Sequence, residues 1–232
     1  RRMLHVRRRG LGHSPVKLAH VVSWSSLKGY YDNAPLNDFR TGAARRAAEY
    51  GYELEDFLVD GVTMSPMRLA GILRARGVPG VLLSPSEQLA ASLDASAPAP
   101  RPELDFIAYA TIGYTVTLPR VSRAVPDHAG AMQLACKRLR SRGYQRIGLA
   151  LSTNMHQRVH GRWLAGWVCA QTNPFDAPRP LITPSLDKTG PFDRWLAREK
   201  PDVIVTSDWG GVCPHLRRLG LRAPDDIGLV DL

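Results

Sequence analysis

Polar and aromatic side chains follow directly after several short apolar runs of the sequence, where they could take part in binding chemistry. The residues in this position are Ser23 and Trp24 after 16–22, Ser84 after 78–83, and Ser207, Asp208 and Trp209 after 203–206. If these runs are parallel strands, their carboxyl ends meet at one edge of a sheet, where ligand crevices form. An aromatic ring can stack on a sugar or a nucleobase while carboxylates and guanidinium groups bind its polar atoms. The pattern predicts a small-molecule site, and ordinary loop chemistry remains the alternative for each residue taken alone.

The sequence lacks the motifs of the common hydrolytic and nucleotide-binding sites. No segment matches GxxxxGK[ST], GxSxG or HExxH, and the nearest approach to GxGxxG, at residues 10–15, precedes the first predicted strand instead of following it. Cys136, Cys169 and Cys213 form no CxxC pair, so neither a disulfide framework nor a zinc knuckle is indicated. We therefore predict no catalytic residues and no cofactor.

One pair of histidines has a spacing that a metal site could use. His156 and His160 lie four residues apart, which places them on one face of a helix. Arg158 and Arg162 lie between and beside them, and a cationic neighbourhood disfavours a divalent ion. No carboxylate accompanies the pair closely, so no metal site is predicted.

Two successive series of apolar runs and amphipathic segments must position these residues. The runs at 16–22, 54–59, 78–83 and 106–110 alternate with helical periodicity, and a second series begins at 147–151 and ends with strands at 203–206 and 227–230. This alternation is typical of βαβ units and a parallel sheet, so we predict an α/β fold. We expect a single helix around 158–170 in the second series. With 44% hydrophobic residues and no apolar run near the roughly 20 residues that cross a bilayer, no membrane segment is expected.

The positive charge of the chain is unevenly distributed. The net charge is +10, and residues 1–17 contain six arginines and lysines with no acid. A block of like charge is typical of a solvated tail or of a nucleic-acid contact, and the residues alone leave both open. The body of the chain is not predicted to form a basic nucleic-acid-binding surface.

Three motifs, in order and spacing, resemble the LacI/GalR family of bacterial transcription regulators. The first is VPDHAG at 125–130, followed by Leu139 and by RGYQRIG at 142–148, which is similar to the family's V-x-x-D-N-x-x-G, a helix, and L-x-x-x-G-H-x-x-I-G. The second is PDVI at 201–204 leading to Ser207 and Asp208. The third is LGL at 219–221 with PDDIGLV at 224–230, which is similar to G-x-x-x-P-x-D-I-x-V-V. The resemblance covers about residues 15–232.

This resemblance implies a two-lobed α/β fold like that of periplasmic binding proteins, with parallel sheets flanked by helices and truncated at both ends of the present sequence. Residues 1–14 would be a basic arm or hinge remnant, 15–145 the N-terminal lobe, and 146–232 an incomplete C-terminal lobe. It also implies a small-molecule effector bound between lobes, a homodimer, and operator DNA bound through a helix-turn-helix headpiece absent from this chain. A cytoplasmic location follows from the same resemblance.

The resemblance carries over to particular residues of the expected effector site. The family usually has an effector-contacting arginine a few residues before a glycine–aromatic pair, and here Arg162 lies four residues before Gly166 and Trp167, where three is more usual. Arg158, one turn earlier, competes for this role. Asp127 matches the family's crossover aspartate, which either reaches the ligand or caps its helix. Ser207 and Asp208 match the polar pair after the last strand but one, and Ser23, Trp24 and Trp209 complete the expected site.

Two other classes of protein share parts of this pattern. A periplasmic solute-binding protein has the same fold, but it would carry a secretory leader rather than an arginine-rich arm before the first lobe. An α/β enzyme would show phosphate-binding or nucleophile motifs, which are absent here. We therefore expect the effector-sensing core of a regulator, with a sugar-like ligand and no enzymatic activity.

Overall fold

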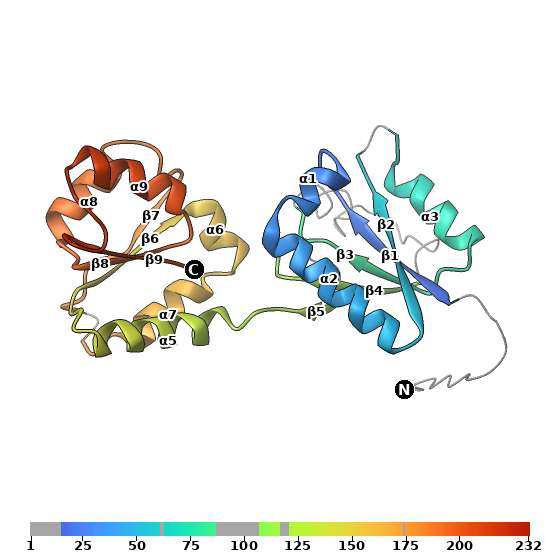
Figure 1. The fold of residues 1–232 in the computed structure, drawn as a ribbon, viewed down its shortest axis with the longest axis horizontal. Coiled ribbons are helices and arrows are strands. Elements are labelled where there is room, and N and C mark those ends of the chain that lie inside the picture. Colours follow the sequence, from blue (N-terminus) through green and yellow to red (C-terminus); the bar gives the residue numbers. More distant parts are fainter. Residues whose placement is uncertain (1–14, 61–62, 87–106, 117–120, 174) are drawn as a thin grey trace. The chain divides into compact units, whose positions relative to one another are not determined.

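Two separate parallel sheets form the framework of the protein (Figure 1). The computed structural model describes residues 15–60, 63–86, 107–116, 121–173 and 175–232. The chain divides into two units, Arg1–Ala124 and Val125–Leu232, and each sheet belongs to one of them. Every strand pairing between the described strands is parallel, which confirms the predicted α/β fold.

The first unit has the strand order β2-β1-β3-β4-β5 among its described residues. The strands are β1 (Val16–Val22), β2 (Tyr52–Leu58), β3 (Gly80–Leu83), β4 (Ala108–Ile112) and β5 (Ser122–Ala124), and the helices are α1 (Leu27–Tyr31), α2 (Ala34–Glu49) and α3 (Pro66–Ala75). Leu69 and Leu73 of α3 pack with Val21 and Leu83 in the larger core cluster. Tyr30 of α1 and Leu36 of α2 pack with Val22 in a smaller one. Consecutive residues of β1 therefore pack against different helices, because successive side chains of a strand point to opposite faces of the sheet.

The second unit has the strand order β7-β6-β8-β9 among its described residues. The strands are β6 (Ile147–Ser152), β7 (Leu181–Thr183), β8 (Val203–Thr206) and β9 (Gly228–Asp231). The helices are α5 (His128–Ser141), α6 (Thr153–Arg158), α7 (Arg162–Ala170), α8 (Pro191–Glu199) and α9 (Trp209–Arg218). Val203 and Val205 face the core cluster that includes α5 and α7, while Ile204 faces the one that includes α8 and α9. Both faces of this sheet are therefore covered, as a parallel sheet requires.

The boundary between the units lies earlier than the sequence-based division at 145/146, because α5 packs against α7 and so belongs to the second unit. The two helices approach so closely that a Cβ atom added at Gly166 would lie 2.9 Å from the Cα atom of Ala129. Trp167, the next residue, donates a hydrogen bond from its indole nitrogen to the Ile147 carbonyl at 3.1 Å. The crossover segment 125–146 is thus fixed to the second unit by α7 and β6.

The predicted helix around 158–170 is also corrected. Two helices, α6 and α7, occupy this region, and they are separated by His160 and Gly161, which have φ angles of 51° and 69°. A left-handed backbone conformation ends a helix, and a non-glycine residue adopts it at a cost. No helix of the described part of the chain is long and apolar enough to span a bilayer.

The close packing at Gly166 leads to a stability prediction. Gly166→Ala should lower the free energy of unfolding by about 1–3 kcal/mol, because the added methyl group meets helix backbone that cannot move aside. Gly71→Ala, at an exposed position of α3 with no atom within 4 Å of the added Cβ, should raise it by about 0.5–1 kcal/mol as a helix substitution. Urea denaturation of both variants checks the pair, and equal effects would contradict the packing argument.

Candidate effector site

The carboxyl ends of β6 and β8 lie side by side in the second unit, with Ala150 paired to Thr206. After β6 the chain enters α6 and α7, whose residues belong to the core cluster on one face of the sheet. After β8 it enters α9, whose residues belong to the cluster on the other face. Two neighbouring strands whose following helices leave in opposite directions form a topological switch point, where α/β sheets bind ligands. This edge of the sheet is therefore the candidate site of the second unit.

Two polar atoms near this edge are buried without a hydrogen-bond partner among the described residues. They are the Ser207 hydroxyl oxygen, directly after β8, and Nδ1 of His156 in α6, directly after β6. An unpaired buried polar atom costs free energy, so each calls for a partner. Ser207 is one of the residues selected from the sequence, and whether it binds a ligand stays a prediction. The sequence pattern singles out His156 only as a possible metal ligand, although its place directly after β6 is the signal that points to this edge.

The two aspartates expected at the site both begin helices. Asp127 caps α5 by accepting a hydrogen bond from the Gly130 amide at 2.9 Å, and Asp208 caps α9 by accepting one from the Gly211 amide at 2.9 Å. Capping accounts for one oxygen of each carboxylate. Asp208 is half-buried at the switch point, whereas Asp127 is exposed. Trp209, the first residue of α9, is about half exposed.

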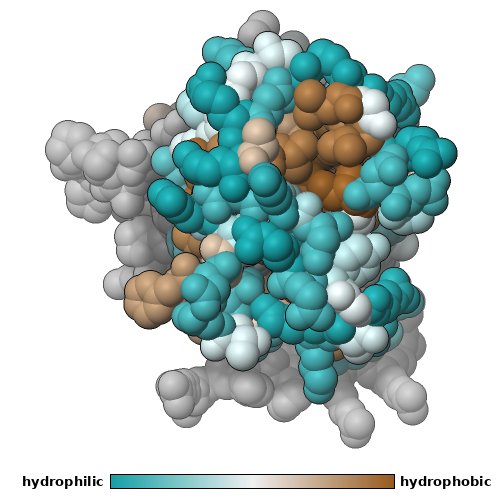
Figure 2. Space-filling view, turned by 90° about the vertical axis from the view of Figure 1, so that its left-hand side faces the viewer, coloured by the Kyte–Doolittle hydropathy of each residue, from teal (hydrophilic) through white to brown (hydrophobic). Residues whose placement is uncertain are grey.

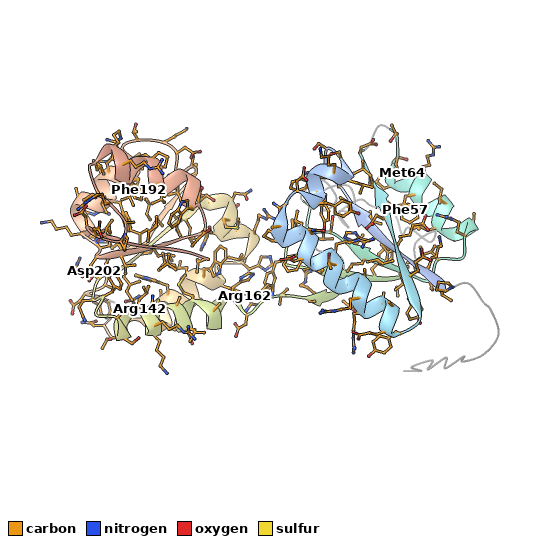
Figure 3. The ribbon with its side chains drawn as sticks, in the orientation of Figure 1. Phe57, Met64, Arg142, Arg162, Phe192 and Asp202 are labelled. Carbon is orange, nitrogen blue, oxygen red and sulfur yellow. The ribbon has the colours of Figure 1, made fainter. Side chains whose placement is uncertain are left out.

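Arg162 begins α7 and lies near the start of α5. Burial, with the positive charge of Arg162 as the second cause, lowers the pKa of His128, the first residue of α5. The His128 ring also contacts the edge of Trp163, with 5.2 Å between the ring centres. Arg158 ends α6 and is half-buried. Figure 3 shows Arg162 at the opposite end of the second unit from Arg142 and Asp202.

In the first unit, Ser23 and Ser84 follow the neighbouring strands β1 and β3, and both are buried. The Ser84 amide donates to the Val21 carbonyl at 2.9 Å, while the Ser84 hydroxyl oxygen is buried with no partner among the described residues. Trp24 is 39% exposed and contacts Tyr30 edge-on, with 6.2 Å between ring centres. The carboxyl edge of this sheet therefore offers hydroxyl groups beside an accessible aromatic face.

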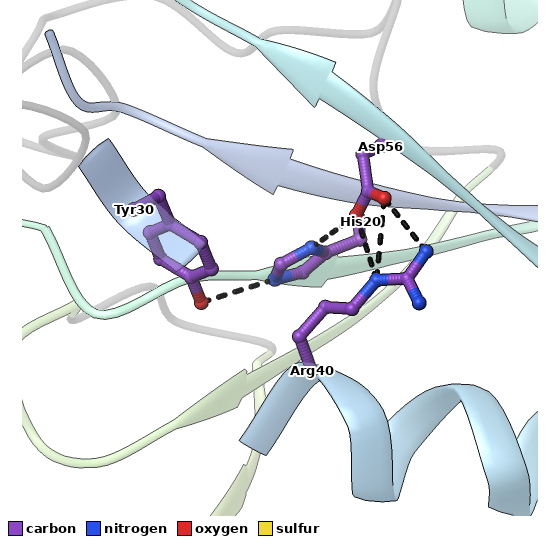
Figure 4. A network of polar contacts seen from close by, with 4 residues as sticks. All are labelled: His20, Tyr30, Arg40 and Asp56. Atoms are coloured by element: carbon purple, nitrogen blue, oxygen red, sulfur yellow. Dashed lines mark hydrogen bonds and ion pairs between the residues drawn. The ribbon is translucent and has the colours of Figure 1, made fainter. Parts of the chain in front are cut away.

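A partly buried polar network connects the same sheet to α1 and α2 (Figure 4). His20 of β1 donates from Nδ1 to Asp56 of β2 at 2.7 Å, and Arg40 of α2 binds the same carboxylate at 2.7 Å. The Tyr30 hydroxyl lies 3.4 Å from Nε2 of His20. This network ties α1 and α2 to the sheet directly behind Trp24. The sequence alone does not reveal this network, because His20 and Asp56 become neighbours only through the β1–β2 register.

The network keeps its charged state at neutral pH. Burial raises the pKa of Asp56, but hydrogen bonds from His20, Arg40 and Tyr31 outweigh that effect and hold the pKa well below its usual range. Burial, together with the negative charge of Asp56, raises the pKa of Tyr30 to about 12. Asp56 is thus an anion and Tyr30 a neutral phenol across the physiological range.

Comparisons with known proteins find similar structures but no similar sequence. No family model and no curated protein matches the chain. Among solved structures, a LacI transcriptional regulator from a Rhodococcus species has a TM-score of 0.60 and 18% identity, over 93% of this chain and 77% of that one. The transcriptional regulator CelR in complex with cellobiose has a TM-score of 0.61 and 22% identity, over 93% and 66%. A LacI family transcriptional regulator from Enterococcus faecium with bound ribose has a TM-score of 0.59 and 15% identity, over 93% and 77%.

At these identities the likeness establishes the fold. Over 93% of its length the chain has the α/β architecture of LacI-type transcription regulators, with parallel sheets flanked by helices. The neighbours described above are regulators rather than enzymes. The predicted fold class and the predicted structural resemblance are therefore both confirmed.

The ion-paired network gives a pH-dependent prediction. Asp56→Asn should lower the free energy of unfolding at pH 7 by about 2–4 kcal/mol, because it leaves Arg40 and His20 without the partly buried anion that they share. The pKa of Asp56 is lower in the folded than in the unfolded chain, where it is about 3.9. The deficit should therefore be constant above about pH 4 and shrink as the pH falls further.

The control for this prediction is Glu55→Gln, one residue earlier in β2. Glu55 pairs with Lys17 and Arg76, whose side chains are 43% and 45% exposed, so its loss should cost less than about 1 kcal/mol. Denaturation at pH 7, 5, 4 and 3 measures both variants. Equal losses at pH 7 would show that the buried network adds no more than a surface ion pair.

Proposed function

We propose that this chain is the effector-sensing core of a LacI-type transcription regulator, and that it binds a small, polar, sugar-like ligand at the carboxyl ends of its strands. The observation that carries the proposal is the fold shared with such regulators over 93% of the chain. Two of the similar structures hold a sugar, cellobiose in one and ribose in the other. In this proposal the protein is a cytoplasmic homodimer that binds operator DNA through a headpiece outside the present sequence.

The polar atoms at the strand ends support a ligand rich in hydroxyl groups. The Ser84 and Ser207 hydroxyls and Nδ1 of His156 are buried and lack protein partners in the described part of the chain, and each could exchange a hydrogen bond with a ligand hydroxyl. Asp208 keeps a second carboxylate oxygen beyond the one that caps α9, and this oxygen can accept from a hydroxyl. These groups suit a polyol better than an apolar ligand.

Cations and aromatic rings complete the proposed site. Arg162 or Arg158 would fix the orientation of the ligand, because a guanidinium offers a planar fork of donors. Trp24 and Trp209, 39% and 48% exposed, would supply ring faces for the apolar side of a sugar. Ser23 and Asp127 would make weaker contacts with the ligand. Asp127 is exposed, and one of its carboxylate oxygens already caps α5.

A binding experiment tests this assignment. A panel of pentoses, hexoses, disaccharides and purines is first screened by thermal shift, and the ligand found is titrated by calorimetry into the wild type and into Ser207→Ala, Asp208→Asn and Arg162→Ala. Each variant should weaken binding by about 1–3 kcal/mol, roughly 5- to 150-fold, because a buried polar partner loses its mate. Asparagine still caps a helix, so Asp208→Asn should retain the wild-type stability.

The control is Asp225→Asn, the same substitution at an exposed residue before β9. It should leave ligand affinity unchanged. Ser207→Ala should not destabilise the fold, because its hydroxyl has no partner to lose among the described residues. Unchanged affinity in all three site variants would place the binding chemistry elsewhere, and binding of no panel member would contradict the proposed ligand class.

A second test addresses DNA. Residues 15–232 alone should bind duplex DNA weakly and without sequence preference, whereas the protein with its headpiece should bind its operator with an affinity that falls steeply with salt as condensed counterions are released. Anisotropy titrations at several salt concentrations measure both. Tight, sequence-selective binding by residues 15–232 would contradict the assignment of this chain as the sensing core.

A further inference from the structure

The net positive charge of the second unit is concentrated at one edge. We call it the amino edge: the last five residues of α5, α8 and α9 together with the loops that lead into β6, β7, β8 and β9. Eleven of the fifteen lysines and arginines of Val125–Leu232 lie in these segments, against five of its ten acids. The edge lies at the opposite end of the sheet from the candidate effector site, as the labelled Arg142 and Arg162 of Figure 3 show.

The carboxylates of this edge are largely engaged in holding the fold. Asp202 accepts hydrogen bonds from the Gln145 and Arg146 amides at 2.7 and 3.0 Å. Glu199 is buried and accepts from the Arg179 amide at 2.9 Å and from the Arg198 side chain at 2.6 Å. Few acceptors therefore remain for the cations at the surface.

The end of α5 carries the cations that these acids leave uncompensated. Lys137, Arg138 and Arg142 are exposed, and their side chains make no hydrogen bond or ion pair within the described part of the chain. A helix C-terminus favours basic residues by about 0.3–1 kcal/mol each, but only within its last turn. That effect accounts for one or two cations, whereas four lie among the last residues of α5 and its cap, counting Arg140.

Exposed hydrophobic side chains accompany these cations. Phe175 is 96% exposed in the loop before β7, and Arg140 ties that loop to α5 by donating to Gln171 at 2.8 Å. Leu219, which caps α9, is 40% exposed. Figure 2 looks onto this side of the molecule and shows a mostly hydrophilic surface with one hydrophobic area toward the upper right. Arginine and aromatic residues are enriched at protein–protein interfaces.

We propose that the amino edge of the second unit is a docking surface for an acidic segment of another protein, with carboxylates bound by the cations of α5 and a hydrophobic side chain bound beside Phe175. Charge complementarity identifies the partner as acidic. The exposed hydrophobic side chains favour a protein over a nucleic acid as the partner, because a charged phosphate backbone makes no favourable contact with them. Phosphates are also commonly bound at helix N-termini, whereas this edge presents helix C-termini.

The test uses the whole chain and three fluorescent probes: poly-glutamate, a 4:1 glutamate–tyrosine copolymer, and a random 20-base-pair duplex. Binding is followed by anisotropy at 50 and 150 mM salt. The variant Lys137→Gln/Arg138→Gln/Arg142→Gln should weaken copolymer binding at least tenfold. The matched control Arg45→Gln/Lys188→Gln/Arg194→Gln removes the same charge from exposed residues outside the amino edge and should change it less than twofold.

Phe175→Ala separates a protein-docking surface from a merely basic one. It should weaken the copolymer three- to tenfold and leave poly-glutamate unaffected. Sugar affinity of the α5 variant should equal that of the wild type, so failure here is distinguishable from failure of the proposed function. The proposal would be overturned if the α5 and control variants lost copolymer affinity equally. It would also be overturned if Phe175→Ala bound both acidic probes as tightly as the wild type does. Duplex binding that is tighter than copolymer binding and is lost in the α5 variant would overturn it too.

Discussion

The close approach of α5 to α7 is the contact on which the second unit depends. It is possible only because residue 166 is glycine, since any Cβ atom there would meet the backbone of Ala129. The contact brings the first turn of α5 beside the start of α7, and so brings His128 within reach of the charge of Arg162. Trp167 then fixes α7 to the first residue of β6. One backbone contact thus places a chain crossover, a helix and a candidate binding residue together.

The candidate site is built from helix starts, and this has a chemical consequence. Asp127 and Asp208 satisfy backbone amides that would otherwise lack partners, so one oxygen of each carboxylate is already occupied by a helix cap. Buried polar groups that have no hydrogen-bond partner in the fold are better evidence of a ligand. Ser84, Ser207 and His156 each keep a buried polar atom that nothing in the described chain satisfies. A fold retains such atoms only where something else compensates them, which makes these three residues more informative than the two aspartates.

The sequence was sufficient to predict the strands of the second unit, because β8 is buried on both faces and reads as four consecutive β-branched residues. It was also sufficient to place Ser207 and Asp208 after that strand. The break between α6 and α7 was not predictable from periodicity, since His160 adopts a left-handed conformation that its residue type does not require. The division of the compact units after Ala124, rather than at 145/146, depends on the partner of α5, which lies in a helix further along the chain. The His20–Asp56 pair likewise depends on strand register, a property of tertiary structure.

The two surfaces of the second unit share a single rigid element. α5 begins at His128, beside Arg162, and its C-cap is Arg142 at the amino edge. Fourteen helical residues at about 1.5 Å each make a rod of roughly 21 Å that connects the two edges of the sheet. A helix of this kind does not bend readily, and Met132, Cys136 and Leu139 hold it along its length in the core. A ligand that moved Arg162 would act on α7, and the missing Cβ at Gly166 leaves no slack between α7 and α5. A displacement of α7 at the candidate site would therefore reach the cations at the other end of α5 as a rigid-body shift, because close-packed interiors transmit strain rather than absorb it.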